Sequence, residues 1–130
     1  MSFLLDTNAV IALMRLDPVV VRRANRHRAA DLATSSVVMF ELYHGAQKSS
    51  RISANLKALA DVGLQVCDFT ESDARVAAEV RTILEGRGQP IGGYDTLIAG
   101  QALARDLTLV TRNIREFERV AGLRLENWEA

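Results

Sequence analysis

Apolar residues follow two patterns along this chain: short continuous runs, and stripes spaced three or four residues apart. The runs predict strands at about residues 2–5, 32–34, 64–69, 107–111 and 123–125. The stripes predict helices at about residues 7–16, 18–28, 37–47, 52–63, 70–86, 95–104 and 114–120. Strands alternating with helices predict an α/β layer fold with a mostly parallel central sheet.

Capping residues support several of these helix starts. Asp17 before Pro18 is typical of an N-cap followed by proline at the first helical position. Ser35 and Ser36 are candidate caps of the next helix, and Thr70 with Asp73 has the spacing of a capping box.

Length and composition agree with one folded domain over residues 1–130. The chain is 48% hydrophobic and 25% charged, and no uncharged run exceeds nine residues, so no membrane span or secretory signal is expected. The single cysteine, Cys67, lies in an apolar run and is expected to be a buried thiol in a cytoplasmic protein. The formal net charge is zero, so any case for nucleic acid must rest on a local site.

Four acidic residues stand at or near the ends of the predicted units. Asp6 ends the first strand and Asp95 opens a helix, so each, taken alone, is most simply a helix cap. Glu41 lies in the apolar helix VVMFELYHG, where a buried carboxylate would need a cation, a donor or a raised pKa. Glu116 follows the strand at 107–111 and could equally be a surface residue paired with an arginine.

Together the acids predict a metal site, because strand ends in such sheets meet in one crevice and clustered carboxylates are tolerated when a hard cation neutralises them. Oxygen ligands favour Mg²⁺ or Mn²⁺. Zinc is not expected, since His27 and His44 are the only histidines and lie far apart in the sequence.

The segments around these acids resemble one family, the VapC-type toxins, which are PIN-domain ribonucleases. The resemblance rests on LLDTN with Asp6, FELYHGAQKS with Glu41, GRGQPIGGYDTLIAGQAL with Asp95 and LTLVTRNIREFERVAGLRLENW with Glu116, and it spans essentially the whole chain. Two positions depart from the family pattern: Gly93 stands where many relatives have proline, and Asn113 where many PIN domains have aspartate.

The resemblance implies a three-layer PIN-like ribonuclease domain that cleaves RNA, often transfer RNA, with Mg²⁺ or Mn²⁺. It also implies a cytoplasmic protein that forms homodimers and is inhibited by a small antitoxin of the VapB type. Asp6, Glu41, Asp95 and Glu116 would be metal ligands and catalytic residues. The polar residues that would support them are Thr7, Asn8, Thr111 and Asn113.

Arginines near the predicted site are candidates for binding RNA phosphates. Arg112 and Arg115 are the main ones, with Arg119 at the same helical spacing, although solvated charge on a helix face explains Arg115 and Arg119 equally well. A second basic patch comprises Arg22, Arg23, Arg26 and Arg28, and it would serve either RNA binding or solubility.

Two other functions remain open at this point. A non-catalytic interaction domain of the same fold would keep the acids as helix caps. A phosphatase with an aspartate nucleophile is disfavoured, because enzymes resembling haloacid dehalogenases have a second aspartate two residues later, where this chain has Asn8.

Overall fold

A computed structural model describes all residues, 1–130, and its centre is a five-stranded sheet in which every neighbouring pair of strands is parallel. The strand order is β3-β2-β1-β4-β5. The bounds are Phe3–Leu5 for β1, Leu32–Ser35 for β2, Gln65–Cys67 for β3, Thr108–Val110 for β4 and Leu125–Glu126 for β5. The α/β class and the parallel sheet predicted from the sequence are therefore confirmed.

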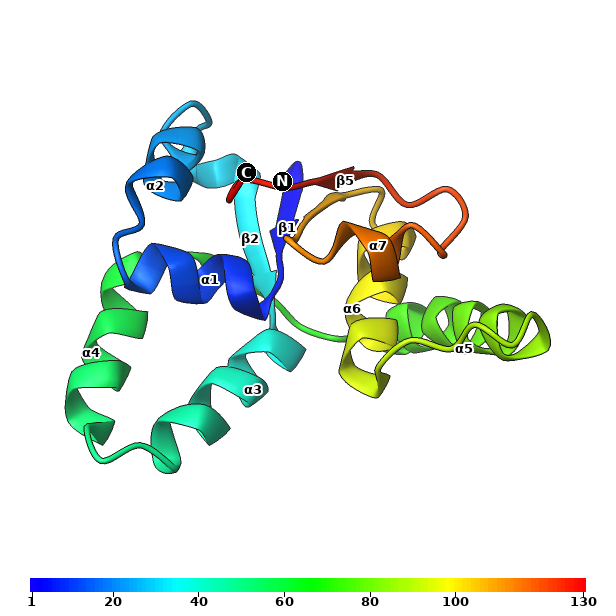
Figure 1. Cartoon of the computed structure of the whole chain (residues 1–130), viewed down its shortest axis with the longest axis horizontal. Helices are drawn as coiled ribbons and strands as arrows, with labels where there is room; N and C mark the ends of the chain where they lie inside the picture. Colours follow the sequence, from blue (N-terminus) through cyan, green and yellow to red (C-terminus); the bar gives the residue numbers. More distant parts are fainter.

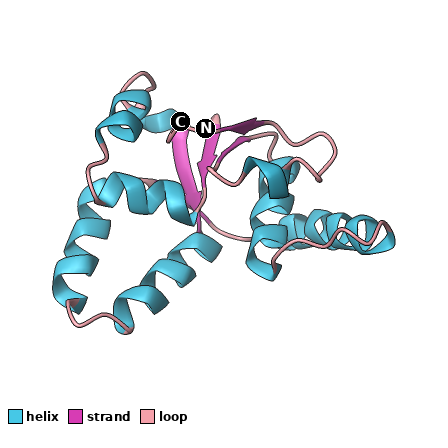
Figure 2. Cartoon of the chain, in the orientation of Figure 1, coloured by secondary structure: helices cyan, strands magenta, loops and turns pink.

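Seven α-helices surround the sheet, with α1, α2 and α4 on one side and α5, α6 and α7 on the other (Figures 1 and 2). Their bounds are Thr7–Met14 for α1, Pro18–Ala24 for α2, Ser36–Gln47 for α3, Ile52–Val62 for α4, Glu71–Gly86 for α5, Gly93–Ala104 for α6 and Ile114–Phe117 for α7. A 3₁₀ turn, Ala29–Asp31, precedes β2. No helix combines the length and the apolar character needed to cross a membrane.

Strand register brings the ends of three strands level with one another. Leu5 pairs with Thr34 on one side and with Val110 on the other. The backbone N–H of Asp6 donates to the Val110 carbonyl at 3.0 Å, and the Thr34 hydroxyl donates to the Leu5 carbonyl at 2.7 Å. The residues that follow β1, β2 and β4 therefore emerge at the same edge of the sheet.

Most helices begin where the caps predict. The Asp17 side chain accepts from Val19 and Val20, Ser35 caps α3, and Thr70 and Asp73 form both bonds of a capping box. Several predicted ends were too long: α1 stops at Met14 because Leu16 adopts a left-handed φ of 56°, and α2 stops at Ala24 rather than continuing to Arg28.

Helices α5 and α6 pack unusually closely, because Gly100 has no side chain. A Cβ on Gly100 would lie 2.5 Å from the Cα and Cβ atoms of Ala77. The backbones of the two helices are in contact here, and this contact fixes the position of α6 along α5.

Near the far end of α6, a polar cluster joins the helix to α5 and to the end of β3. Asp73 is buried, and Arg105 Nη2 lies 3.0 Å from its Oδ2 atom. The amide of Gln101 donates to the same oxygen at 3.3 Å. Burial opposes the ionisation of Asp73, but the hydrogen bonds from Arg105 and Thr70 outweigh it and lower the pKa of that carboxyl group.

Candidate active site

The four acidic residues singled out from the sequence lie together beyond the level ends of β1 and β4. Asp6 follows β1, Glu41 lies in α3, Asp95 in the first turn of α6 and Glu116 in α7. Figure 1 shows the starts of α1, α3 and α6 at this lower edge of the sheet. The four carboxylates also interact electrostatically, since the charges of Glu116, Asp6 and Glu41 each raise the pKa of Asp95.

Asp6 is the most deeply placed of the four, with 5% of its surface exposed. It caps α1, because its Oδ1 atom accepts from the Ala9 N–H at 2.9 Å. Burial raises the pKa of its carboxyl group, while hydrogen bonds from the Thr111 hydroxyl and the Ala9 N–H act in the opposite direction. The simpler interpretation of Asp6 as a cap is thus correct, but the cap alone leaves the second carboxylate oxygen available.

Glu41 is half-buried rather than enclosed, although its helix is the apolar segment VVMFELYHG. Helix α3 exposes Phe40 and Tyr43 to solvent, which leaves a wider open face than the sequence indicates. The Thr7 hydroxyl donates to Glu41 Oε1 at 2.9 Å. This bond joins α1 to α3 across the site.

Asp95 is not a helix cap, contrary to the simplest expectation, because α6 begins two residues earlier at Gly93 and its N-cap residue is Gly92. Burial, the neighbouring Glu116 charge and a proton shared with Glu116 raise the pKa of Asp95 to about 7. The carboxylates of Asp6 and Glu41 add to this effect. Neighbouring carboxylates repel each other when both are ionised, so Asp95 and Glu116 favour keeping one proton between them.

Glu116 is the ionised partner of Asp95. The Gly92 N–H donates to its Oε1 atom at 3.0 Å and the Asn113 amide donates to Oε2 at 2.8 Å, and these bonds lower the pKa of Glu116. Asn113 occupies the N-cap position of α7, but its side chain makes no capping bond and acts as a neutral donor to Glu116 instead. Thr111 accepts from the Asn113 N–H at 3.0 Å, so the supporting residues are linked.

None of the four acids forms a salt bridge. Arg112 lies 3.9 Å from Glu129, Arg119 donates to the Pro90 carbonyl, and Arg115 is exposed. In the second basic patch, Arg23 binds the carbonyl oxygens of Asn127 and Ala130, so part of that patch is structural. No cation of the protein is therefore in direct contact with the site, and Arg112 and Arg119 lower the pKa of Asp6 and of Glu116 only from a distance.

The donor set suits a hard divalent cation in kind, since it consists of carboxylate oxygens whose mutual repulsion a dication would relieve. As placed, however, no three Asp, Glu, His or Cys side chains are arranged to ligand one ion. Glu41 and Glu116 are each turned toward neutral donors of the protein.

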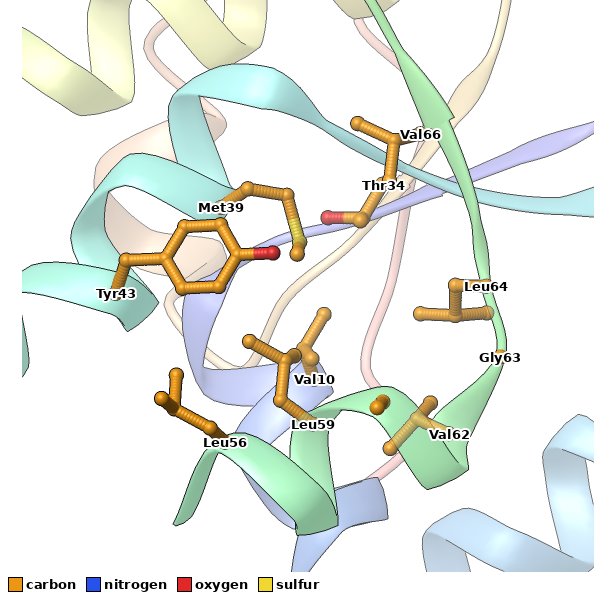
Figure 3. Close-up of a pocket in the computed structure, with 11 residues that line it drawn as sticks. Val10, Thr34, Met39, Tyr43, Leu56, Leu59, Val62, Gly63, Leu64 and Val66 are labelled. Carbon is orange, nitrogen blue, oxygen red and sulfur yellow. The ribbon is translucent and has the colours of Figure 1, made fainter. Parts of the chain in front are cut away.

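A hollow elsewhere in the molecule has a different character. It measures about 350 Å³ and is enclosed by α1, β2, α3, α4 and β3 (Figure 3). Its walls are mostly apolar, and Figure 3 shows Met39, Tyr43, Leu56 and Leu59 directed toward it. No acidic residue lines it, so it offers no phosphodiester chemistry.

Comparison with known proteins places the chain in a family. The PIN-domain family model matches residues 3–123. The chain is 38% identical to the tRNA(fMet)-specific endonuclease VapC of Shigella flexneri, over 98% of each protein. It is 37% identical to ribonuclease VapC2 of Rickettsia felis, over 99% of each. This chain belongs to the PIN-domain family, among its VapC-type ribonucleases.

Solved VapC-type complexes have the same fold. The crystal structure of DNA-bound VapBC from Salmonella typhimurium superposes with a TM-score of 0.92, at 37% identity and with 98% of each chain covered. VapBC2 from Rickettsia felis, bound to promoter DNA, gives a TM-score of 0.90 at 36% identity. The three-layer PIN fold and the toxin family inferred from the motifs are therefore confirmed. The roles of individual residues stay a prediction.

Sequence reasoning missed the C-terminus as part of the site, and it named no partner for the backbone of the glycine-rich turn before Asp95. The Gly92 N–H holds Glu116, and Glu129 is close enough to raise the pKa of Asp6. The paired glycines of PIGGY were the available signal for the first, since a glycine-rich turn lets backbone approach a side chain. No sequence pattern indicated Glu129.

Proposed function

We propose that this VapC-type ribonuclease is a metal-dependent endoribonuclease whose cation is held by Asp6, Glu41, Asp95 and Glu116. The observation that carries the proposal is the convergence of these four carboxylates beyond the ends of β1 and β4, where none of them forms a salt bridge. Burial and the charges of the other three carboxylates accordingly raise the pKa of Asp95. An uncompensated cluster of this kind is costly to a protein without a bound cation, so it indicates function rather than stability.

A bound Mg²⁺ or Mn²⁺ ion would supply Lewis-acid activation of a phosphate oxygen and of the attacking water. The residues of the chain supply position and charge. Asp6, fixed by the Ala9 N–H, and Asp95, on the first turn of α6, provide rigid oxygens. Thr7, Asn113 and the Gly92 N–H orient the two glutamates. Asn8, in the first turn of α1, belongs to the same supporting group.

The substrate we propose is structured RNA, with transfer RNA as the first choice. The Shigella flexneri and Salmonella typhimurium relatives are named as tRNA(fMet)-specific endonucleases. In this chain Arg112 and Arg115 are exposed beside Thr111 and Glu116 and would bind RNA phosphates. Net neutrality of the whole chain makes such local cations necessary.

We also propose a small antitoxin of the VapB type as the partner, acting in the cytoplasm, and a homodimeric toxin. The solved relatives are toxin–antitoxin complexes. The apolar hollow between α3 and α4 offers an apolar segment of such a partner a packing surface. Light scattering of the toxin, alone and with its antitoxin, tests both assemblies, and a monomer under both conditions would contradict them.

The decisive experiment is cleavage of purified transfer RNA by antitoxin-free protein. Cleavage is expected with Mg²⁺ or Mn²⁺ and should disappear with EDTA, then return when excess Mn²⁺ is added. Equal cleavage with EDTA would remove the metal mechanism. Absence of both cleavage and Mn²⁺ binding would favour the non-catalytic interaction domain, and hydrolysis of phosphomonoesters but not RNA would favour the phosphatase.

A further inference from the structure

Two aromatic side chains stand in solvent at the edge of the acidic site. Phe40 is 53% exposed and Tyr94 is 48% exposed. Their ring centroids are 5.6 Å apart, and the planes are inclined at 52°. The ring of His44 lies 6.2 Å from that of Phe40 and is nearly parallel to it, at 15°. None of these rings belongs to the hydrophobic core, so core packing does not explain them.

Each ring immediately precedes one of the acids on the same helix. Phe40 precedes Glu41 on α3, and Tyr94 precedes Asp95 on α6. Helices α3 and α6 pack against each other, which is why residues far apart in the sequence meet here. The backbone before Tyr94 also borders open space, because a Cβ on Gly93 would meet no atom within 4 Å.

We propose that Phe40 and Tyr94 form a stacking platform for one unpaired nucleobase of the RNA, next to the phosphate that is cleaved. The proposal deepens the proposed function and rests on it. Bases splayed out of RNA stack on exposed aromatic rings, and such stacking tolerates different bases because each has a π-face. His44, parallel to Phe40, supports that ring from the side along the helix.

A nucleobase suits this surface better than another protein chain. Stable protein interfaces bury about 800 Å² per partner and exclude charged residues from their centre. Here the apolar surface consists of two rings, and carboxylates adjoin both. A nucleotide whose phosphate bound the cation proposed at the acids would bring its own base within reach of the rings, so one ligand would satisfy both features.

The test measures binding and cleavage separately. Single-stranded RNA of about twelve nucleotides, carrying 2-aminopurine at one position in turn, is titrated with protein in Ca²⁺ in place of Mg²⁺, so that oxygen ligands still hold a dication, and a gel verifies that the RNA stays intact. Stacking should quench the fluorescence at one position with the wild-type protein. Phe40→Ala and Tyr94→Ala should each abolish this quenching and weaken binding by roughly tenfold.

Leucine and tryptophan variants distinguish stacking from general apolar contact. Phe40→Leu should behave like the alanine variant, while Phe40→Trp should retain quenching. Tyr43→Ala is the matched control, because Tyr43 is a similarly exposed ring (49%) on the same helix, but it faces the apolar hollow. In cleavage of transfer RNA, the Phe40 and Tyr94 variants should raise KM about tenfold and change kcat less.

The outcomes separate the two proposals. Metal-dependent cleavage with unchanged KM and quenching in both alanine variants would overturn the platform and leave the proposed function standing. Ring-dependent quenching without any cleavage by the wild type would do the reverse. If the alanine variants instead convert a dimer to a monomer in gel filtration, with quenching unchanged, the rings form a protein interface and the platform is wrong.

Discussion

Two buried aspartates of this protein have opposite surroundings. Asp73 is 1% exposed and Asp6 is 5% exposed. Asp73 accepts from Arg105, Gln101 and the Thr70 N–H, and its pKa is lowered. Asp6 accepts from the Ala9 N–H and lies near the Thr111 hydroxyl, with three further carboxylates nearby and no salt bridge, and its pKa is raised by burial.

The surroundings of Asp73 fit a carboxylate that stabilises the fold, whereas those of Asp6 fit a carboxylate that binds a ligand. Both clusters contact α6, which carries Asp95 in its first turn and has Arg105 directly after its last residue. Only the cluster near Arg105 contains its own cation. Where the protein leaves the charge unbalanced, an external cation is the simplest compensation.

The largest expected effect is the loss of activity in Asp95→Asn and Asp6→Asn. Each change removes one ligand charge from the site, and RNA cleavage in Mg²⁺ should fall at least about 100-fold. The fold should survive, because an asparagine at position 6 can still accept from the Ala9 N–H. Initial cleavage rates with thermal unfolding of each variant provide the measurement, and an active Asp95→Asn protein would remove Asp95 from the ligand set.

Next in size should be the effects at Glu116, the proposed fourth ligand, and at Asn113, which stands where many PIN domains have aspartate. Glu116→Gln loses a charge and should reduce cleavage by roughly 10- to 100-fold, with partial recovery at high Mn²⁺. Asn113→Ala removes only the 2.8 Å hydrogen bond to Glu116 and should cost about tenfold or less. Full activity in Glu116→Gln beside an inactive Asn113→Ala would mean that the roles are reversed.

Substitutions in the cluster of Asp73, Gln101 and Arg105 should change stability rather than activity. Arg105→Ala leaves the buried Asp73 carboxylate without its cation and should lower the free energy of unfolding by about 2 kcal/mol, since Arg105 itself is partly exposed. Arg81→Ala, which breaks an exposed pair with Glu85, should cost less than about 0.5 kcal/mol. Urea unfolding compares the two, and cleavage per folded molecule should stay unchanged in both.

The smallest expected effects are on the pH dependence of stability, and they have opposite signs at Asp95 and Asp73. The pKa of Asp95 is higher in the folded state than the ordinary 3.8, so folded protein binds more protons and stability should fall as pH rises from about 4 to about 7. Asp95→Asn should therefore be more stable than wild type at pH 8, by about 1 kcal/mol after discounting for solvent screening of a half-buried group. Saturating Mn²⁺ should reduce the difference by stabilising the ionised form.

Asp73 should behave in the reverse sense. Its lowered pKa contributes stability at all pH values above the ordinary 3.8, and that contribution is lost as pH falls through the folded value. Comparison of wild type with Asp73→Asn in acid unfolding isolates it. A steeper loss of stability in Asp73→Asn than in wild type below pH 4 would contradict the assignment.

The sequence predicted the elements well where a cap or an apolar run defined them, as at Asp17, Thr70 and residues 107–111. It predicted the ends poorly where backbone geometry decides, as at Leu16, whose left-handed φ no pattern indicated. Asp6, Asp95 and Glu116 were singled out because they stand at or near the ends of predicted elements, which parallel strands bring together, and Glu41 because it is a carboxylate in an apolar helix. The hydrogen bonds that set their pKa values, from Gly92, Thr7 and Asn113, depend on distances that only the structure supplies.

The close contact at Gly100 has a genetic consequence. Any side chain at that position would push α6 away from Ala77, and α6 carries Asp95. If expression of the toxin stops growth, cells that survive will be those whose toxin has failed. Selection for survivors should then return Gly100 substitutions alongside Asp6 and Asp95 substitutions, although Gly100 is fully enclosed between two helices and can touch no RNA.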